Sequence, residues 1–210
     1  MTPENFLDRR ENAARHPIGK LRPVPLKTPR KLDAVDAVVL HSMGFEWSQY
    51  GIGIYDKVDA HFVVLRSGKA VHLHDISVYL NASAGFNRRG IAIEFEGNPI
   101  SDRGVAFEEA KFGRHAPTLS QIFAGRGLVQ TLKEQHKISF VFAHRQSEGK
   151  GGVRGNCPGP EIWYNVGEWA KSQLGLSDGG PGFAIQGGTP IPQTWRERSN
   201  DLTLEDMFRS

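Results

Sequence analysis

The sequence lacks the hallmarks of several large protein classes. Its 210 residues contain one cysteine, Cys157, so a framework of disulfides within the chain is excluded. No apolar run approaches about 18 residues, the length that a helix needs to cross a bilayer. The apolar stretches are strand-sized, as in residues 34–40, which Asp36 interrupts. We therefore expect no membrane insertion.

A strong excess of one charge sign is also missing. Lysine and arginine number 26 against 23 acidic residues, a net charge of +3. This balance differs from the dense basic surface of a nucleic-acid-binding protein, so no nucleic-acid partner is expected. Residues 1–17 have mixed charges and no apolar core before a small-residue cleavage site. They do not read as a secretory signal, and we expect synthesis in the cytoplasm without a signal peptide.

The composition that is present suits one globular domain, with 39% hydrophobic and 10% aromatic residues. Residues 1–33 combine a short helix over 4–14 with a stretch rich in proline and basic residues, which predicts an N-terminal basic arm. Residues 34–176 form the predicted domain. Residues 177–210 are predicted to be a Gly/Pro-rich C-terminal tail, which either packs on the domain or docks on a protein partner. We expect a monomer.

Short β-branched and aromatic runs bounded by turn residues predict five strands, at 36–41, 60–66, 69–74, 91–97 and 139–144. Arg66 to Lys69 have the length and the glycine of a hairpin turn, so the second and third strands should pair antiparallel. Apolar periodicity predicts helices over 118–136, with Phe123 in the apolar stripe, and from Pro160 to Leu174. Strands and helices do not alternate strictly, so we expect an α/β (α+β) fold with a mixed sheet covered by helices.

Three residues that can bind metal lie at strand or loop ends. His41 and His144 each close a predicted strand, and Cys157 precedes the last predicted helix. Two imidazoles and a thiolate are a zinc donor set, and three protein ligands leave a fourth position free, as in catalytic sites. With eight histidines in the chain, this placement also arises by coincidence. The residues alone therefore leave open a buried and inert thiol at Cys157.

The strand predicted over 91–97 carries two acidic residues with the same orientation. Because side chains alternate along a strand, Glu94 and Glu96 lie on one face and the apolar residues on the other. On an edge strand such carboxylates face solvent. On a central strand Glu94 would be buried, and a buried carboxylate beside a metal is suited to general base catalysis. The pattern leaves both interpretations open.

Four blocks of the sequence resemble a known family in order and spacing. They are VVLHSM (38–43), AHFVVLRSGK (60–69), NRRGIAIEFEGN (87–98) and FAHRQS (142–147) with RGNCPGPEIW (154–163). Together they resemble the zinc-dependent N-acetylmuramoyl-L-alanine amidases of the type 2 group, which includes phage lysozyme-like amidases and peptidoglycan recognition proteins. The resemblance covers about residues 34–176.

The resemblance implies a mixed sheet of five or six strands flanked by helices. It implies Zn²⁺ held by His41, His144 and Cys157, with Glu94 as the catalytic acid and base. The implied reaction is hydrolysis of the amide bond between N-acetylmuramic acid and L-alanine in peptidoglycan or muropeptides. Such an enzyme acts on the cell wall after release or delivery, as an endolysin does, or on muropeptides in the cytoplasm.

The chain departs from the family pattern in three places. Gly155 stands where relatives carry a lysine or threonine that steadies the oxyanion, so Arg154 or His61 is expected to replace it. Ser83 begins a Ser-Ala-Gly sequence where relatives have His-Ala-Gly. The segment 98–117 is longer than the usual connection and is expected to form a lid or a groove wall.

Two other functions fit the same residues. One is a peptidoglycan-binding module without catalysis, and the other is a structural component of a phage or injection apparatus. Trp47, Tyr50 and Tyr55 follow His41 in a glycine-rich loop. Their rings either stack on sugars or pack against the rest of the domain.

Overall fold

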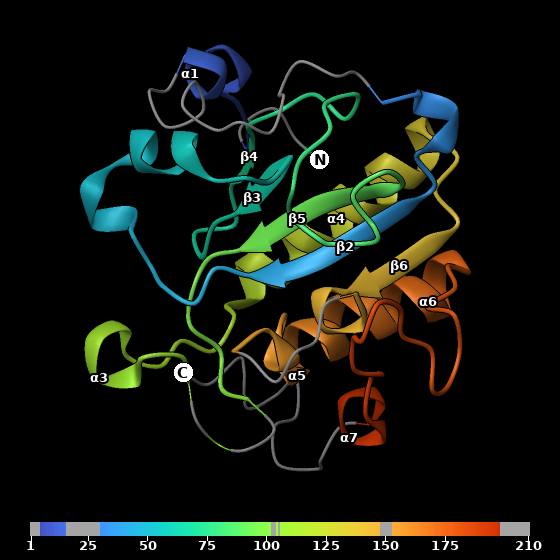
Figure 1. The fold of residues 1–210 in the computed structure, drawn as a ribbon. Coiled ribbons are helices and arrows are strands. Elements are labelled where there is room, and N and C mark those ends of the chain that lie inside the picture. Colours follow the sequence, from blue (N-terminus) through green and yellow to red (C-terminus); the bar gives the residue numbers. More distant parts are fainter. Residues whose placement is uncertain (1–4, 16–29, 102–103, 105, 148–152, 198–210) are drawn as a thin grey trace.

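The computed structural model describes residues 5–15, 30–101, 104, 106–147 and 153–197 (Figure 1). Its centre is a six-stranded sheet with the order β1-β4-β3-β5-β2-β6. The strands are β1 (Phe6–Asp8), β2 (Ala37–Ser42), β3 (Phe62–Val64), β4 (Ala70–His72), β5 (Gly90–Phe95) and β6 (Phe140–Ala143). All five predicted strands form, and the predicted fold class is confirmed.

Helices flank the sheet. They are α1 (Arg10–Arg15), α3 (Glu109–Phe112), α4 (Leu119–Gln135), α5 (Pro160–Ile162), α6 (Trp169–Leu174) and α7 (Gln193–Arg196). A π-helical segment, Trp163–Glu168, joins α5 and α6 into one helical stretch, as the sequence predicts. Within the described residues, no helix has the length and apolar character needed to cross a membrane.

The strand pairing makes the sheet mixed. β2 runs parallel to both β5 and β6, and β5 runs parallel to β3. β3 and β4 form the predicted antiparallel hairpin. Its turn contains Gly68 at φ +85°, and the Gly68 N–H donates to the carbonyl of Leu65 at 2.9 Å. Glycine takes this conformation without the steric cost that a side chain would add.

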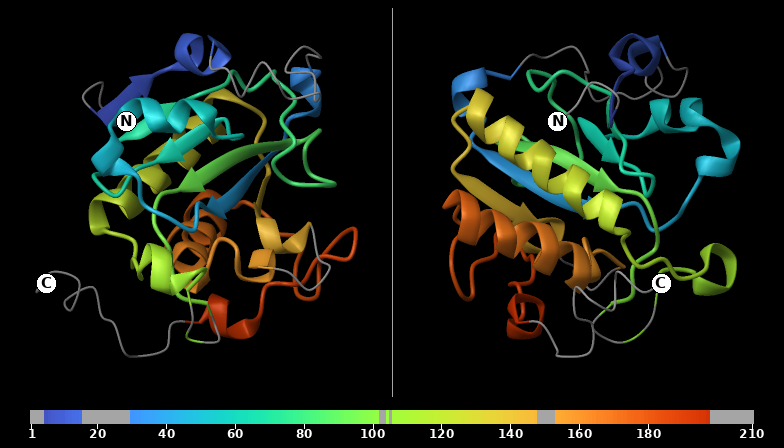
Figure 2. Two further views of the ribbon diagram at one scale, coloured as in Figure 1. Left: turned by 60° about the vertical axis from the view of Figure 1, so that its left-hand side comes forward. Right: turned by 180° about the vertical axis from the view of Figure 1, so that it is seen from behind.

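One face of the sheet is covered by α4 and by the helical stretch 160–174 (Figure 2, right). The predicted apolar face of that stretch packs into the main core, with Ile162, Val166 and Ala170 buried. Gly125 lets α4 approach closely, because a Cβ there would lie 2.6 Å from the ring of Phe95. Phe123, which the sequence assigns to the apolar stripe of α4, is 56% exposed and does not join the buried face of the helix.

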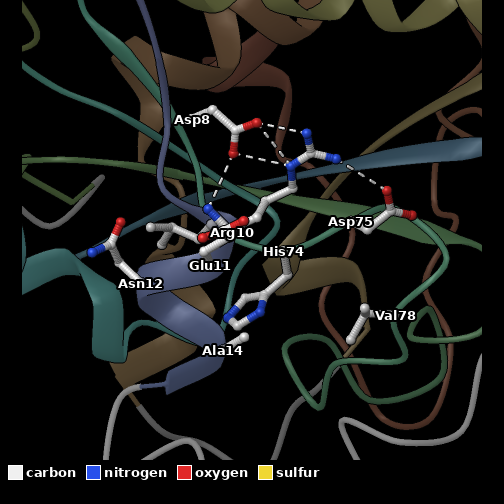
Figure 3. Close-up of a pocket in the computed structure, with 9 residues that line it drawn as sticks. Asp8, Arg10, Glu11, Asn12, Ala14, His74, Asp75 and Val78 are labelled. Carbon is white, nitrogen blue, oxygen red and sulfur yellow. Dashed lines mark hydrogen bonds and ion pairs between the residues drawn. The ribbon is translucent and has the colours of Figure 1, made fainter.

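The N-terminal residues join the sheet. A helix over 4–14 is wrong in its first half, because β1 pairs in parallel with β4 and the helix begins only at Arg10. Strand pairing here outweighs local helix propensity. Hydrogen bonds from Arg10 lower the pKa of Asp8 to about 2, and Arg10 also reaches Asp75 at 3.4 Å (Figure 3). Arg9 binds Asp56 through two contacts of 2.6 Å.

The described part of the predicted tail packs on the domain. Ser177 forms a parallel bridge with Phe140, and Trp195 in α7 is completely buried in the main core. The guanidinium of Arg145 lies 4.3 Å from the centre of the Trp195 ring. The other alternative for the tail was docking on a protein partner. The last residues of the tail, 198–210, lie outside the described residues.

Candidate metal centre

The register of the central strands places His41 beside Glu94. These residues are paired neighbours on β2 and β5, near the carboxyl ends of both strands. Their side chains lie on the face opposite α4, because Leu40 and Ile93 next to them point into the main core. The strands β5, β2 and β6 run parallel and end on the same side of the sheet (Figure 1). His144 follows β6 directly, so it lies at the same end of the strands as His41 and Glu94. Crevices at the carboxyl ends of parallel strands are common binding sites.

Cys157 comes from a turn that folds back onto this edge. Its carbonyl accepts a hydrogen bond from the Arg145 N–H at 3.0 Å, and its Sγ accepts one from the Ser42 N–H at 3.2 Å. One potential ligand atom each from His41, His144 and Cys157 lies within 4.8 Å of the others. The two imidazole rings are 4.3 Å apart between centroids. The structure thus brings the three predicted ligands together.

The chemistry of this group fits zinc. Two imidazole nitrogens and a thiolate are typical zinc ligands, and all three side chains are buried. The N–H donor on the sulfur favours the thiolate, which is the form that binds metal. Across the described residues, no other set of three His, Cys, Asp or Glu side chains converges in this way.

Ser83 holds the ring of His41 from the side opposite Glu94. The Ser83 Oγ is 2.8 Å from Nε2 of His41, whereas Nδ1 of the same ring faces Oε1 of Glu94 at 3.8 Å. Ser83 is 2% exposed, and its N–H donates to the Asn87 side chain at 2.5 Å. A hydrogen bond on one ring nitrogen orients the other toward a metal. The sequence showed Ser83 only as a departure from His-Ala-Gly and gave no signal of this contact.

A groove with a volume of about 710 Å³ opens above these residues. Glu94, His144 and Cys157 line it. One wall comes from segment 98–117, which confirms the expectation that this segment forms a groove wall; its lining residues are Asn98, Pro99, Ser101, Ala106, Phe107 and Glu108. The ligand group is therefore open to a substrate on one side.

Glu94 lies in β5, whereas Glu96 comes directly after its last residue, Phe95, and the two carboxylates differ in their surroundings. Glu94 is partly exposed in the groove. Glu96 is 3% exposed and accepts hydrogen bonds from the hydroxyl of Tyr55 and from the N–H groups of Trp47 and Arg66. Glu96 therefore anchors the 43–59 loop, and the buried ring of Tyr55 packs in the core.

The structure does not bring His61 into the groove. The Ala92 N–H donates to Nδ1 of His61 at 3.0 Å, and Nε2 lies 3.1 Å from the carbonyl of Val78 and from Nη2 of Arg30. Burial, together with the charge of Arg30, holds the pKa of His61 well below 6.5. Both ring nitrogens of His61 thus have partners within the fold.

Arg154 is described only in its backbone. It lies in the turn Val153–Asn156, directly before Cys157. Its side chain lies outside the described part of the chain. The structure therefore places neither predicted oxyanion donor against the ligand group.

Removal of the Ser83 hydroxyl should weaken metal binding. We expect Ser83→Ala to bind zinc roughly 10- to 100-fold more weakly, because the ring of His41 loses its orienting hydrogen bond. Competition with a chromogenic chelator measures the affinity. Ser172→Ala, at an exposed position on α6, is the control and should bind zinc like the wild type. Equal affinities in the two variants would show that Ser83 does not position His41.

The buried neutral ring of His61 should make stability depend on pH. Below pH 6.5 the unfolded chain binds a proton at His61 that the folded chain does not, so the free energy of unfolding falls as the pH falls. In His61→Gln this slope should be smaller by up to about 1.4 kcal/mol per pH unit. Urea denaturation of the metal-free protein between pH 5 and 8 measures it. Identical pH slopes of the unfolding free energy in the wild type and in His61→Gln would contradict the assignment of His61 as a buried neutral ring.

Comparisons with known proteins agree with this geometry. The family model described as N-acetylmuramoyl-L-alanine amidase matches residues 31–160, more than half of the chain. A search of curated protein sequences gives no significant match. Among solved structures, the N-acetylmuramoyl-L-alanine amidase LysC from Clostridium intestinale is similar with a TM-score of 0.54 and 17% identity. That alignment covers 84% of this chain and 100% of LysC.

Peptidoglycan recognition proteins are similar to the same degree. Drosophila PGRP-LB has a TM-score of 0.55 and 15% identity, over 83% of this chain and 97% of that chain. Peptidoglycan recognition protein-LE, solved in complex with tracheal cytotoxin, has the same four values. At these identities the structural likeness establishes the fold, and the family match covers the segment that carries the ligand group. The chain therefore belongs to the N-acetylmuramoyl-L-alanine amidase family.

Proposed function

We propose that this protein is a zinc-dependent N-acetylmuramoyl-L-alanine amidase that acts on peptidoglycan or muropeptides. The observation that carries the proposal is the group of His41, His144 and Cys157 within 4.8 Å, with Glu94 beside it in an open groove. A binding module has no need of a carboxylate next to a metal ligand set, whereas hydrolysis requires a proton acceptor there.

His41, His144 and Cys157 would hold the metal. When bound, zinc supplies a Lewis acid that polarises a carbonyl and lowers the pKa of water. Ser83 fixes the ring of His41, and the Ser42 N–H stabilises the sulfur of Cys157. These contacts hold the ligand side chains before a metal arrives, which reduces the cost of assembling the site.

Glu94 is the proposed proton carrier. Its Oε1 lies 3.8 Å from Nδ1 of His41, and Glu94 lines the groove where the scissile amide would lie. The carboxylate accepts a proton from the attacking water and donates it to the alanine nitrogen as the C–N bond breaks. The products are the lactyl carboxylate on the sugar and a free stem peptide.

We retain Arg154 as the proposed oxyanion donor because its backbone lies in the turn that leads into Cys157. His61 is not proposed for this task, since its nitrogens contact Val78, Ala92 and Arg30. The proposed setting is the cell wall after release or delivery, with cytoplasmic muropeptides as the alternative substrate.

Mass spectrometry of peptidoglycan and soluble muropeptides, incubated with and without a zinc chelator, tests the proposal. We expect chelator-sensitive release of stem peptides that begin with L-alanine. Cleavage that persists in the chelator would contradict zinc dependence. Binding of zinc and of muropeptide without any cleavage would instead identify a non-catalytic binding module.

The variant Glu94→Gln tests the proposed role of Glu94 as proton carrier, because it keeps the shape of the side chain and removes its basicity. We expect it to bind zinc like the wild type and to lose at least about 100-fold in kcat, the usual contribution of a general base. Glu134→Gln, at an exposed position on α4, is the control. Wild-type turnover in Glu94→Gln would remove Glu94 from the mechanism.

A further inference from the structure

A row of four aromatic rings begins at the wall of the groove. We call Phe107, Phe112, Phe45 and Trp47 the aromatic row. Phe107 lines the groove, and its ring lies 6.0 Å from that of Phe112. Phe112 is 5.9 Å from Phe45, which stacks on Trp47 at 3.8 Å. The row thus runs from the groove onto the 43–59 loop.

The groove end of the row is held in place. Asn98 is 1% exposed, and its amide nitrogen donates to the carbonyls of Phe107 and Gly113 at 2.7 Å. Its side-chain oxygen accepts the Phe107 N–H at 3.0 Å. Phe107 also packs against Gly44, where a Cβ would lie 3.1 Å from the ring. One buried amide therefore positions both ends of the segment that contains α3.

The rings differ in how accessible they are. Phe107 is 37% exposed, although it is large and apolar. Phe112 is partly exposed, with the Lys111 ammonium 4.7 Å from its ring centre. Trp47 has Phe45 and the ammonium of Lys57 against it, so it supports the row. Phe107 is therefore the most exposed ring of the row, and Phe112 follows it with the Lys111 ammonium at its border, while Phe45 and Trp47 are also partly exposed.

We propose that the aromatic row is a subsite for the glycan strand, which selects polymeric peptidoglycan over single-sugar muropeptides. This inference rests on the proposed function, because that function places the lactyl-bearing sugar beside Glu94. The adjoining sugars of a glycan strand then continue along a wall of the groove. Phe107 is an exposed aromatic ring in the wall that segment 98–117 forms. Pyranose rings present apolar C–H faces that pack on aromatic rings, and their hydroxyl groups accept hydrogen bonds from an ammonium.

The test separates glycan binding from hydrolysis. Wild type, Phe107→Ala/Phe112→Ala and Phe123→Ala are titrated with chitohexaose, a peptide-free sugar polymer, and binding is followed by NMR. We expect binding by the wild type and about tenfold weaker binding by the double variant, as two lost ring contacts imply. Phe123 is an exposed ring on α4, outside the groove. Its variant should bind like the wild type.

The second measurement is the ratio of kcat/KM on sacculi to kcat/KM on N-acetylmuramoyl-tripeptide. We expect this ratio to fall about tenfold in the double variant and to recover in Phe107→Tyr/Phe112→Tyr, which keeps the rings. An equal loss on both substrates would overturn the proposal, because it would show that the row only maintains the groove. Circular dichroism and residual cleavage of the small substrate establish that the variants fold.

Two other results would overturn the subsite. Absence of chitohexaose binding in the wild type is one. Weaker binding of the sugar-free stem tripeptide by the double variant, with chitohexaose binding unchanged, is the other, since it would place the peptide on the row. Failure of the proposed function is distinguishable, because a zinc-loaded protein that cleaves nothing still reports glycan binding by NMR.

Discussion

The site depends on the register of β2 against β5 and β6. Pairing of His41 with Glu94 puts an imidazole and a carboxylate side by side, and pairing of Leu40 with Ala143 puts His144 one residue beyond. A slip of one residue would turn His41 toward the core and leave Leu40 facing the groove. The apolar residues that fill the α4 side therefore determine the register, and through it the position of the ligands on the other side.

Much of this arrangement could be predicted from the sequence. Strand patterns ended at His41 and His144, and alternation along 91–97 assigned Glu94 to one face. These local rules left open an inert thiol at Cys157 and a solvent-facing Glu94, and the resemblance to the amidase family implied the ligand set and its carboxylate. Ser83 could not be found in this way, because its contact with His41 joins residues 42 positions apart. The three-residue strand β1 was missed because its pairing with β4 is non-local and its sequence is not distinctively strand-like.

Loops that carry no periodic pattern give the groove its shape. Segment 98–117 showed only its unusual length in the sequence, whereas the fold organises it around the buried amide of Asn98. Pro99 packs against Gly159, in the turn after Cys157, where a Cβ would lie 3.2 Å away. The wall that would contact a glycan and the turn that supplies the third ligand are thus in direct contact. This contact links the shape of the groove to the position of the cysteine.

X-ray absorption spectroscopy of the zinc-loaded protein tests the central claim most directly, which is that the sheet edge and the Cys157 turn build one metal site. The account predicts one zinc per chain, with one sulfur at about 2.3 Å and two imidazole nitrogens at about 2.0–2.1 Å. In Cys157→Ser the sulfur contribution should disappear. A first shell of nitrogen and oxygen alone in the wild type would contradict the assignment of Cys157 as a ligand.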